Sequence, residues 1–461
     1  MRLADTKRKQ KENQEKKQRN NMSGVLVIGG GLAGVEAAWA LANNGISVTI
    51  AEMKPEKRSP AHKSDMLAEL VCSNSLKAQR LASAAGLLKA EMELLGSLCV
   101  ECAKACSVPA GGALAVDRDK FSQMVTEKIR NHPLIEIECR EVTEIPEGNV
   151  IVAAGPLASD ALAEDIKALC GGALSFFDAA APIVTDESID KSCAFTQSRY
   201  DRGGEDDYLN CPMNKEEYEN FYNELVNAES AELHSFDKKK GVYEGCMPIE
   251  VMASRGADTM RFGPLKPVGL RDPRTGHRPW AVLQLRREDA SGTMYNLVGF
   301  QTNLKFGEQK RVFSMIPALK NAEFIRYGVM HRNTFIDSPR HLNSDFSFRG
   351  RKGLYFAGQI TGVEGYMESA ASGILAGLNM SRYLKGEEPI NLSEITMLGA
   401  LSKYISNETV ENFQPMGANF GIIPALDELI KDKKLRYEAL ANRSLGYYKN
   451  LLSEERRGED E

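Results

Sequence analysis

The chain has 461 residues, of which 43% are hydrophobic and 26% are charged, and its formal net charge is −5 at pH 7. This balance excludes a disordered or collagen-like chain, and the length predicts two or three structural units. The sequence contains no run of 18 apolar residues and no apolar segment near its N-terminus, so neither a membrane span nor a signal peptide is predicted.

Residues 1–21 form a basic leader without apolar periodicity, which we expect to be disordered. The first 20 residues carry eight Lys or Arg and three Asp or Glu, so the rest of the chain is more acidic than the total charge suggests. The leader is either a nucleic-acid-binding arm or a non-structural extension, and we favour the extension. Bulk charge therefore predicts no nucleic-acid binding, and any such site must be a local patch.

The first ordered elements predict a βαβ unit. Val25–Ile28 is a short apolar run typical of a buried parallel strand. Apolar residues then recur at helical spacing from Leu32 to Asn44, and Gly45 provides a C-cap signal. Ile46–Glu52 predicts the second strand.

The turn between the first strand and the helix matches Gly-x-Gly-x-x-Gly. Gly29 permits a tight turn, Gly31 lets the backbone approach a pyrophosphate, and Gly34 allows close packing of helix on strand. Glu52, 18 residues after Gly34, is placed to accept hydrogen bonds from ribose hydroxyls, which favours FAD or NAD over NADP. The preceding apolar strand, the following helix and the acidic residue at the end of the next strand together disfavour a glycine-rich turn without a ligand. The predicted dinucleotide-binding residues are Gly29, Gly30, Gly31, Leu32, Ala33, Gly34 and Glu52.

Later segments favour FAD. Residues 80–105 predict a helix, and residues 145–155 predict a strand that ends in Gly155, like the second strand–Gly element of two-dinucleotide flavoproteins. Residues 353–384 return to strand, glycine-rich turn and helix, and Gly358 lies in that turn. The amino end of this last helix can stabilise negative charge on a reduced isoalloxazine.

Residues 195–330 contain aromatic and charged runs, turn signals and strand-like stretches, which predict an inserted α+β unit with a strand at Trp280–Leu285. Its basic residues either form a solvated face or neutralise RNA phosphates while aromatic rings stack on bases. The clusters are Lys238–Lys240; Arg271, Arg274, His277, Arg278, Trp280, Arg286 and Arg287; and Lys305, Lys310 and Arg311.

Nine cysteines, an odd number scattered along the chain, favour reduced thiols in a cytoplasmic protein over a disulfide framework. Cys72, in a short polar segment, and Cys246, in a Gly-Cys-x-Pro loop, are either reactive thiols or small buried hydrophobes. Cys99, Cys102 and Cys106 have a spacing that suggests metal, but no fourth ligand is near, so we expect ordinary helix positions and no metal site. No Cys-x4-Cys pair follows the nucleotide helix, which disfavours a disulfide reductase.

Long strings in the chain resemble the TrmFO family, the folate- and FAD-dependent tRNA (uracil-5-)-methyltransferases, over residues 22–445. The strings are Ser59–His62, Ala68–Leu76, Val108–Arg118, Glu244–Glu250, Tyr327–Phe335 and Ala357–Ser372. The resemblance implies an α/β fold: a Rossmann-like FAD-binding domain of the two-dinucleotide flavoprotein type, interrupted by an α+β insertion domain. The expected boundaries are 22–205 and 336–445 for the two parts of the FAD-binding domain, 206–335 for the insertion on the RNA and folate side, and 446–461 for a charged tail.

The resemblance also implies a reaction. The product is 5-methyluridine in the T loop of tRNA, the carbon donor is 5,10-methylenetetrahydrofolate, and NAD(P)H is the reductant. Cys72 and Cys246 match the family's two functional cysteines, and Tyr366 matches a tyrosine of the flavin and folate pocket. We assign the attack on carbon 6 of uracil to Cys246, and Cys72 is either the base for the carbon 5 proton or a thiol that protects the flavin.

The chain departs from the family pattern at Asn303 and Phe306, where His and Trp are usual, and at His62-Lys63, where His-His is common. Folate stacking and RNA contacts are therefore expected to differ. Ribosomal RNA is the alternative substrate, and a flavin-dependent modifier of wobble uridines is the alternative enzyme. A non-catalytic RNA-binding flavoprotein and a simple NAD(P)H oxidase are the remaining alternatives.

Overall fold

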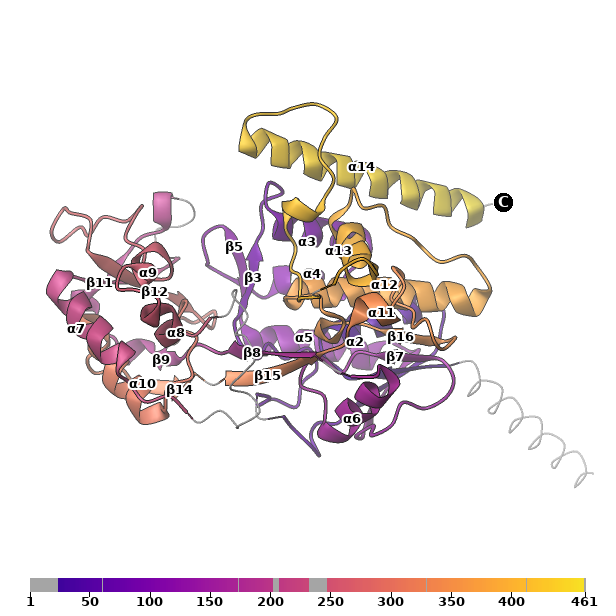
Figure 1. Ribbon diagram of the computed structural model, residues 1–461, viewed down its shortest axis with the longest axis horizontal. Helices are drawn as coiled ribbons and strands as arrows, with labels where there is room; N and C mark the ends of the chain where they lie inside the picture. The colour runs from indigo at the N-terminus through magenta and orange to yellow at the C-terminus, as the bar shows by residue number, and fades with distance from the viewer. Residues whose placement is uncertain are drawn as a thin grey trace, which may run out of the picture.

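The computed structural model describes residues 24–59, 61–172, 174–201, 207–231, 247–328, 330–411 and 413–459. The predicted leader 1–21, the cluster Lys238–Lys240 and Cys246 lie outside the described residues. Two units with separate hydrophobic cores make up the described chain, and Figure 1 shows them side by side. Among the described residues, no helix is long and apolar enough to span a bilayer.

The first unit is built on a five-stranded parallel sheet, which confirms the predicted Rossmann-like class. Nearly all residues of its three central strands are buried, as expected for strands covered on both faces. Across the sheet the strands are β16 (Leu354–Phe356), β7 (Val150–Val152), β1 (Val25–Ile28), β2 (Val48–Glu52) and β6 (Ile135–Cys139).

The strand order reverses beside β1. The chain passes from β1 to β2 on one side, whereas β7 joins β1 on the other side much later. Ligands of open α/β sheets bind at such a switch point, outside the carboxyl ends of the strands. The order therefore places a ligand site between the ends of β1 and β7.

Helices cover the parallel sheet, and two of them pack closely through small residues. A Cβ added to Gly373 of α12 would lie 2.1 Å from the carbonyl oxygen of Ala33 in α2, and one on Gly377 would lie 2.6 Å from that of Ala37. Only glycine permits this approach, which brings the amino ends of both helices to the same sheet edge. The helices of this unit are α2 (Leu32–Asn43), α3 (Ala84–Leu94), α4 (Leu98–Ala105), α5 (Arg118–Asn131), α6 (Asp160–Leu169), α11 (Ser338–His341), α12 (Tyr366–Lys385), α13 (Met397–Ser406) and α14 (Lys433–Glu459).

Two predicted elements of this unit have different bounds. The single helix expected over 80–105 is two helices, because Gly96 has φ +76° and Ser97 caps the start of α4. The strand expected over 145–155 is only β7, since Gly148 at φ +107° keeps the preceding residues out of the sheet. A small sheet of β3 (Ser75–Ala78), β5 (Ala113–Val116) and β4 (Ser107–Val108) lies beside this unit.

The C-terminal helix is part of the fold. α14 continues to Glu459 through the segment expected as a charged tail, and Tyr448 within it is fully buried. Buried Glu91 of α3 accepts hydrogen bonds from the amides of Met397 and Leu398 at the start of α13, and from the Ser444 hydroxyl of α14. Burial raises the pKa of Glu91 to about 7, so at pH 7 the carboxyl group that joins three helices is neutral far more often than an exposed glutamate.

The second unit is α+β, as predicted for the insertion. Its six-stranded antiparallel sheet has the order β10 (Phe195–Thr196), β11 (Leu209–Met213), β12 (Ala281–Arg287), β13 (Met294–Leu297), β9 (Ile183–Thr185) and β14 (Phe324–Arg326). The predicted strand at Trp280–Leu285 corresponds to β12. The accompanying helices are α7 (Lys215–Val226), α8 (Ile249–Ser254), α9 (Thr259–Phe262) and α10 (Phe306–Phe313).

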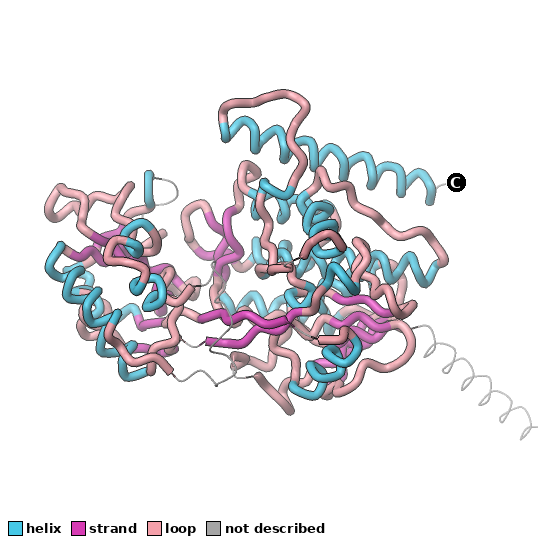
Figure 2. The backbone as a smooth tube through the Cα atoms, viewed as in Figure 1, coloured by secondary structure: helices cyan, strands magenta, loops and turns pink. Residues whose placement is uncertain are grey.

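A two-stranded ribbon joins the units. β8 (Leu174–Ala179) leads into the second unit and β15 (Met330–Phe335) leads back, and the two strands pair antiparallel between the units (Figure 2). Strands β9 and β10 belong to the antiparallel sheet although they precede residue 206. We therefore propose to set the limits of the inserted unit at this ribbon.

Candidate functional site

A pocket opens at the carboxyl ends of the parallel strands, on both sides of the switch point. Its space of about 970 Å³ includes volume that is open to solvent. Its lining includes most of the residues predicted to bind the cofactor: Gly29, Gly31, Leu32, Ala33, Glu52, Gly155, Gly358 and Tyr366. The other two, Gly30 and Gly34, shape the loop from behind.

Each of the three glycines of the Gly-x-Gly-x-x-Gly motif is required at its position for a different physical reason. Gly29 has φ +102°, and a Cβ added there would lie 2.7 Å from the carbonyl oxygen of Ala153. A Cβ on Gly34 would lie 1.9 Å from the carbonyl oxygen of Gly29, so this glycine permits helix-on-strand packing. A Cβ on Gly31 would meet no atom of the described protein within 4 Å and would enter the pocket.

The space at Gly31 suits a diphosphate. Gly31 is the N-cap of α2, and it makes no side-chain capping bond there. The unpaired amides and the positive end of the helix dipole favour a negatively charged group at this position. The residues present therefore fit the pyrophosphate of a dinucleotide such as FAD.

Glu52, at the end of β2, fixes the glycine loop and faces the pocket. Its carboxylate accepts hydrogen bonds from the amides of Gly30 (2.8 Å) and Lys54 (3.0 Å), and the residue is 8% exposed. Carboxylate oxygens keep further lone pairs, so Glu52 can still accept hydrogen bonds from ribose hydroxyls.

The opposite end of the pocket is formed by the segment after β16. Gly358 has φ +86°, and its amide donates to the Ser372 hydroxyl of α12 at 2.7 Å. This bond holds the turn against α12, whose first residue is Tyr366. The ring of Tyr366 therefore lies at the pocket's edge, where the flavin segment was predicted.

Tyr366 connects the pocket to Cys72, although 294 residues separate them. The Tyr366 hydroxyl donates to Cys72 Sγ at 3.1 Å, and it accepts from the amides of Cys72 (2.7 Å) and Ser73 (3.2 Å). Burial raises the pKa of Tyr366 well above its usual value, and Cys72 raises it further. The tyrosine thus stays protonated and can donate a hydrogen bond to a thiolate.

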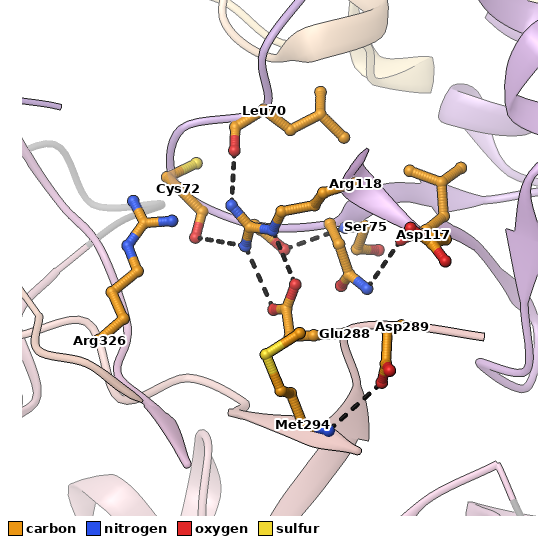
Figure 3. A network of polar contacts seen from close by, with 12 residues as sticks. Leu70, Cys72, Ser75, Asp117, Arg118, Glu288, Asp289, Met294 and Arg326 are labelled. Carbon is orange, nitrogen blue, oxygen red and sulfur yellow. Dashed lines mark hydrogen bonds and ion pairs between the residues drawn. The ribbon is translucent and has the colours of Figure 1, made fainter. Parts of the chain in front are cut away.

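Two arginines approach the same segment from different units. Arg118 of α5 donates to the Cys72 carbonyl at 3.4 Å (Figure 3). Arg326 of β14 donates to the Val71 carbonyl. Burial lowers the pKa of Arg326, and the charge of Arg118 lowers it further. Burial also opposes the charged form of Arg118, but pairing with Glu288 outweighs it and raises the pKa. Positive charge near Cys72 favours its thiolate form.

Sequence reasoning missed two polar residues of the pocket, His62 and Glu69. His62 Nδ1 lies 2.7 Å from the Ser59 hydroxyl, and burial and then the charge of Lys54 lower the pKa of His62, so the ring is neutral at pH 7. Glu69 accepts from the amide of Lys63 at 2.8 Å. Both occur in strings that resemble the family, but only the fold places them at the pocket.

Part of the predicted RNA patch is wrong. Arg286 is 6% exposed, and it donates to Asn74 Oδ1 at 2.9 Å and to the Ser73 hydroxyl at 3.0 Å. Its guanidinium therefore joins the two units near Cys72 and is closed to phosphate. Lys305 and Arg311, also predicted to face RNA, are exposed but lie in ion pairs with glutamates.

Two of the departures from the family pattern, Asn303 and Phe306, lie just before and at the start of α10. The Asn303 amide donates to Glu250 at 2.7 Å, and Phe306, 55% exposed, stacks on Tyr327 with ring centroids 4.9 Å apart. Asn303 therefore contacts the described segment that follows Cys246.

The cysteines with metal-like spacing occupy buried positions on and directly after α4, as predicted for ordinary helix positions. Burial raises the pKa of Cys102 to about 12, and it also raises the pKa of Cys99 well above its usual value. Within the described ranges, no group of three His, Cys, Asp or Glu side chains could hold a metal ion.

Comparison with solved structures supports the fold. GidA of Aquifex aeolicus, in two crystal forms, superposes with TM-scores of 0.66 and 0.65 at 17% and 19% sequence identity. The matches cover 94% of this chain and 76% and 78% of the GidA chains.

Sequence comparisons show the family. The model described as glucose inhibited division protein A matches residues 24–388. A protein named methylenetetrahydrofolate--tRNA-(uracil-5-)-methyltransferase TrmFO from Ligilactobacillus salivarius is 57% identical, over 93% of this chain and 98% of its own length. The protein of the same name from Acetivibrio thermocellus is 58% identical over the same shares. The chain therefore belongs to the TrmFO family of methylenetetrahydrofolate–tRNA-(uracil-5-)-methyltransferases.

Proposed function

We propose that this protein transfers the methylene carbon of 5,10-methylenetetrahydrofolate to carbon 5 of a uridine in tRNA, with NAD(P)H as reductant and FAD as bound cofactor. The observation that carries the proposal is the bond from Tyr366 to Cys72 Sγ, at 3.1 Å. It joins a thiol to the pocket whose glycine loop fits a dinucleotide. Thiol chemistry of this kind needs a reducing compartment, so we place the enzyme in the cytoplasm.

Different described residues are expected to bind different parts of FAD. The amides at the start of α2 bind the diphosphate beside Gly31, and Glu52 accepts hydrogen bonds from the ribose. Gly358 and Tyr366 border the end where the isoalloxazine belongs. Bound FAD supplies the two-electron redox chemistry and the passage of the carbon from folate to uracil.

The chain must make carbon 5 of uracil nucleophilic. We assign this step to Cys246: its thiolate adds to carbon 6 and converts the ring to an enolate. Carbon 5 then bonds to the incoming carbon and loses its proton, and the thiolate leaves carbon 6. The carbon gains a hydride that originates from NAD(P)H, and the two nitrogens of the folate regain protons, one of them from solvent. Uridine, methylenetetrahydrofolate, NAD(P)H and one proton thus give 5-methyluridine, tetrahydrofolate and NAD(P)+.

We assign removal of the carbon 5 proton to Cys72. The Tyr366 hydroxyl donates to its sulfur, and Arg118 and Arg326 place positive charge nearby. All three favour a thiolate, which is the form that can accept a proton. Protection of the flavin by Cys72 is the alternative role.

The test of the function is product mapping. The purified protein is given methylenetetrahydrofolate and NADPH with tRNA or ribosomal RNA separately, and the RNA is examined by mass spectrometry. We expect 5-methyluridine in the T loop of tRNA. Product in ribosomal RNA alone would show that ribosomal RNA, and not tRNA, is the substrate. A modified wobble uridine would identify a different tRNA-modifying enzyme. Oxidation of NADPH without any RNA product would overturn the proposal.

The exposed loop between Leu270 and β12 is the proposed RNA platform. Arg271 and Arg278 are exposed, and the Arg261 guanidinium lies 3.8 Å from the centroid of the Trp280 ring. Arg274 instead pairs with Asp272 at 2.7 Å within the loop. A stacked uridine must be extruded at a cost of a few kcal/mol, so phosphate contacts are needed to hold the RNA.

Neutralising the loop is expected to weaken RNA binding. In the double variant Arg271→Gln/Arg278→Gln, the slope of log K against log salt should fall by about 0.7–0.9 for each phosphate that the protein no longer neutralises. Filter binding at several salt concentrations measures the slope. Lys128→Gln on the distant α5 is the control, and an unchanged slope in the double variant would exclude this loop from the RNA interface.

A further inference from the structure

We infer that Arg118 is a positioning residue for Cys72, and that Glu288 of the inserted unit holds Arg118 in its working orientation. The inference rests on the proposed role of Cys72 and deepens it. It assigns a purpose to an ion pair between the two units that neither cofactor binding nor the RNA loop explains.

The geometry surrounds Cys72 (Figure 3). Arg118 Nη1 donates to the Leu70 carbonyl at 2.5 Å and Nη2 to the Cys72 carbonyl at 3.4 Å. The other side of the guanidinium faces Glu288, with Nε to Oε2 at 2.7 Å and Nη2 to Oε1 at 3.2 Å. The guanidinium of Arg118 thus hydrogen-bonds two carbonyls of the Leu70–Cys72 segment and one carboxylate of the inserted unit.

Burial makes this arrangement specific. The side chains of Arg118 and Glu288 are 13% and 3% exposed. Removing two charges from water costs about as much as their attraction gains, so a buried pair is weak evidence for stability. A bidentate arginine–carboxylate pair does fix orientation, because both groups are planar.

The inserted unit also contacts the segment on both sides of Cys72. Arg326 donates to the Val71 carbonyl, and Arg286 donates to the Ser73 hydroxyl. These contacts add to the hydrogen bonds that Tyr366 and Arg118 of the FAD-binding unit make with the segment, and they exist only while the inserted unit is docked. We infer that docking of the RNA-side unit sets the reactivity of the thiol.

The inference is testable because an effect of Arg118 on the orientation of Cys72 and an effect of its charge predict different results for kcat and for the pH midpoint of Cys72 alkylation. Arg118→Met removes a cation, so the pH midpoint of Cys72 alkylation should rise. Glu288→Gln leaves Arg118 positive and unpaired, so the midpoint should fall. If orientation limits the reaction, both variants lose kcat despite the opposite pH shifts.

The experiment measures kcat, KM for RNA and the pH profile of alkylation by iodoacetamide, followed at the Cys72 peptide by mass spectrometry. We expect kcat to fall roughly 100-fold in Arg118→Met and roughly 10-fold in Glu288→Gln, with partial recovery in Arg118→Lys. KM should change little, because the seven residues of β12 separate Glu288 from the RNA loop by about 24 Å.

Glu308→Gln is the matched control. Glu308 makes the same bidentate pair with Arg311, at 2.9 and 2.7 Å, on the surface of α10. This variant should keep the wild-type kcat and alkylation profile. If Arg118→Met does not retain flavin, Glu288→Gln carries the test, because it changes charge with almost no change in shape.

Two outcomes would overturn the inference. In one, Glu288→Gln lowers the alkylation midpoint but keeps the wild-type kcat, which would leave only a charge effect. In the other, kcat falls in both variants while the alkylation profiles match wild type, which would indicate a structural role. Cys72→Ala separates the two proposals: if it retains activity, the assigned role of Cys72 fails, whatever the Arg118 and Glu288 variants show.

Discussion

Cys246→Ala is expected to lower kcat by at least roughly 10⁴ and to abolish covalent trapping of RNA that carries 5-fluorouridine. The fluorine on carbon 5 cannot leave as a proton, so a thiolate that has added to carbon 6 stays attached. Denaturing gel electrophoresis of the protein–RNA adduct measures trapping. Cys72→Ala is expected to lower kcat by about 10²–10⁴, as for loss of a general base, but to keep the trapping.

The surroundings of the two thiols motivate this division. Cys72 is held by Tyr366 at the border of the cofactor pocket. Cys246 directly precedes a described segment tied to the inserted unit, where the Ile249 amide donates to the Gln301 carbonyl at 2.7 Å. Glu250 continues that attachment through the Thr302 hydroxyl at 2.9 Å. The nucleophile is thus assigned to the RNA side and the base to the flavin side.

Cys139→Ala is the control, because Cys139 is an exposed thiol on β6. It should keep wild-type turnover and trapping. Trapping by Cys246→Ala but not by Cys72→Ala would reverse the roles of the two residues. Wild-type product formation in both variants would exclude thiol catalysis altogether.

The parts of the fold that were predictable from sequence are those with local causes. The apolar run of β1, the glycine turn and the helical spacing of α2 fall within about 20 consecutive residues, and each glycine has the predicted geometry. Glu52 was predictable because the strand–turn–helix–strand unit has a nearly constant length. By contrast, the break of the helix over 80–105 depends on Gly96, whose effect competes with a strong apolar pattern on both sides.

The parts that escaped prediction depend on contacts between distant segments. Arg118 and Glu288 are 170 residues apart, and Tyr366 and Cys72 are 294 apart. No periodicity or spacing links such positions, since each is set by how the two units pack. For the same reason Arg286 resembled a surface cation in the sequence, although the fold buries it against the thiol segment.

Gly31→Val is expected to give a folded protein that has lost its flavin. The backbone of Gly31 has φ −74°, which any residue adopts, and a Cβ there meets no atom of the described chain within 4 Å. Valine therefore strains nothing in the protein, but its methyl groups occupy the space assigned to the diphosphate at the start of α2. We expect FAD affinity to fall at least about 100-fold, equivalent to ~2.7 kcal/mol, as measured by flavin absorbance and titration with FAD.

Gly34→Val is the comparison variant, because it distinguishes loss of the fold from loss of FAD binding alone. A Cβ on Gly34 would lie 1.9 Å from the carbonyl oxygen of Gly29, so this variant should lose the fold together with the flavin. Gly31→Val should instead unfold at the temperature of flavin-free wild type, because only the ligand's contribution is missing. Wild-type FAD affinity in Gly31→Val would show that the diphosphate does not bind at the amino end of α2, and the position of every other cofactor contact would then have to be reassigned.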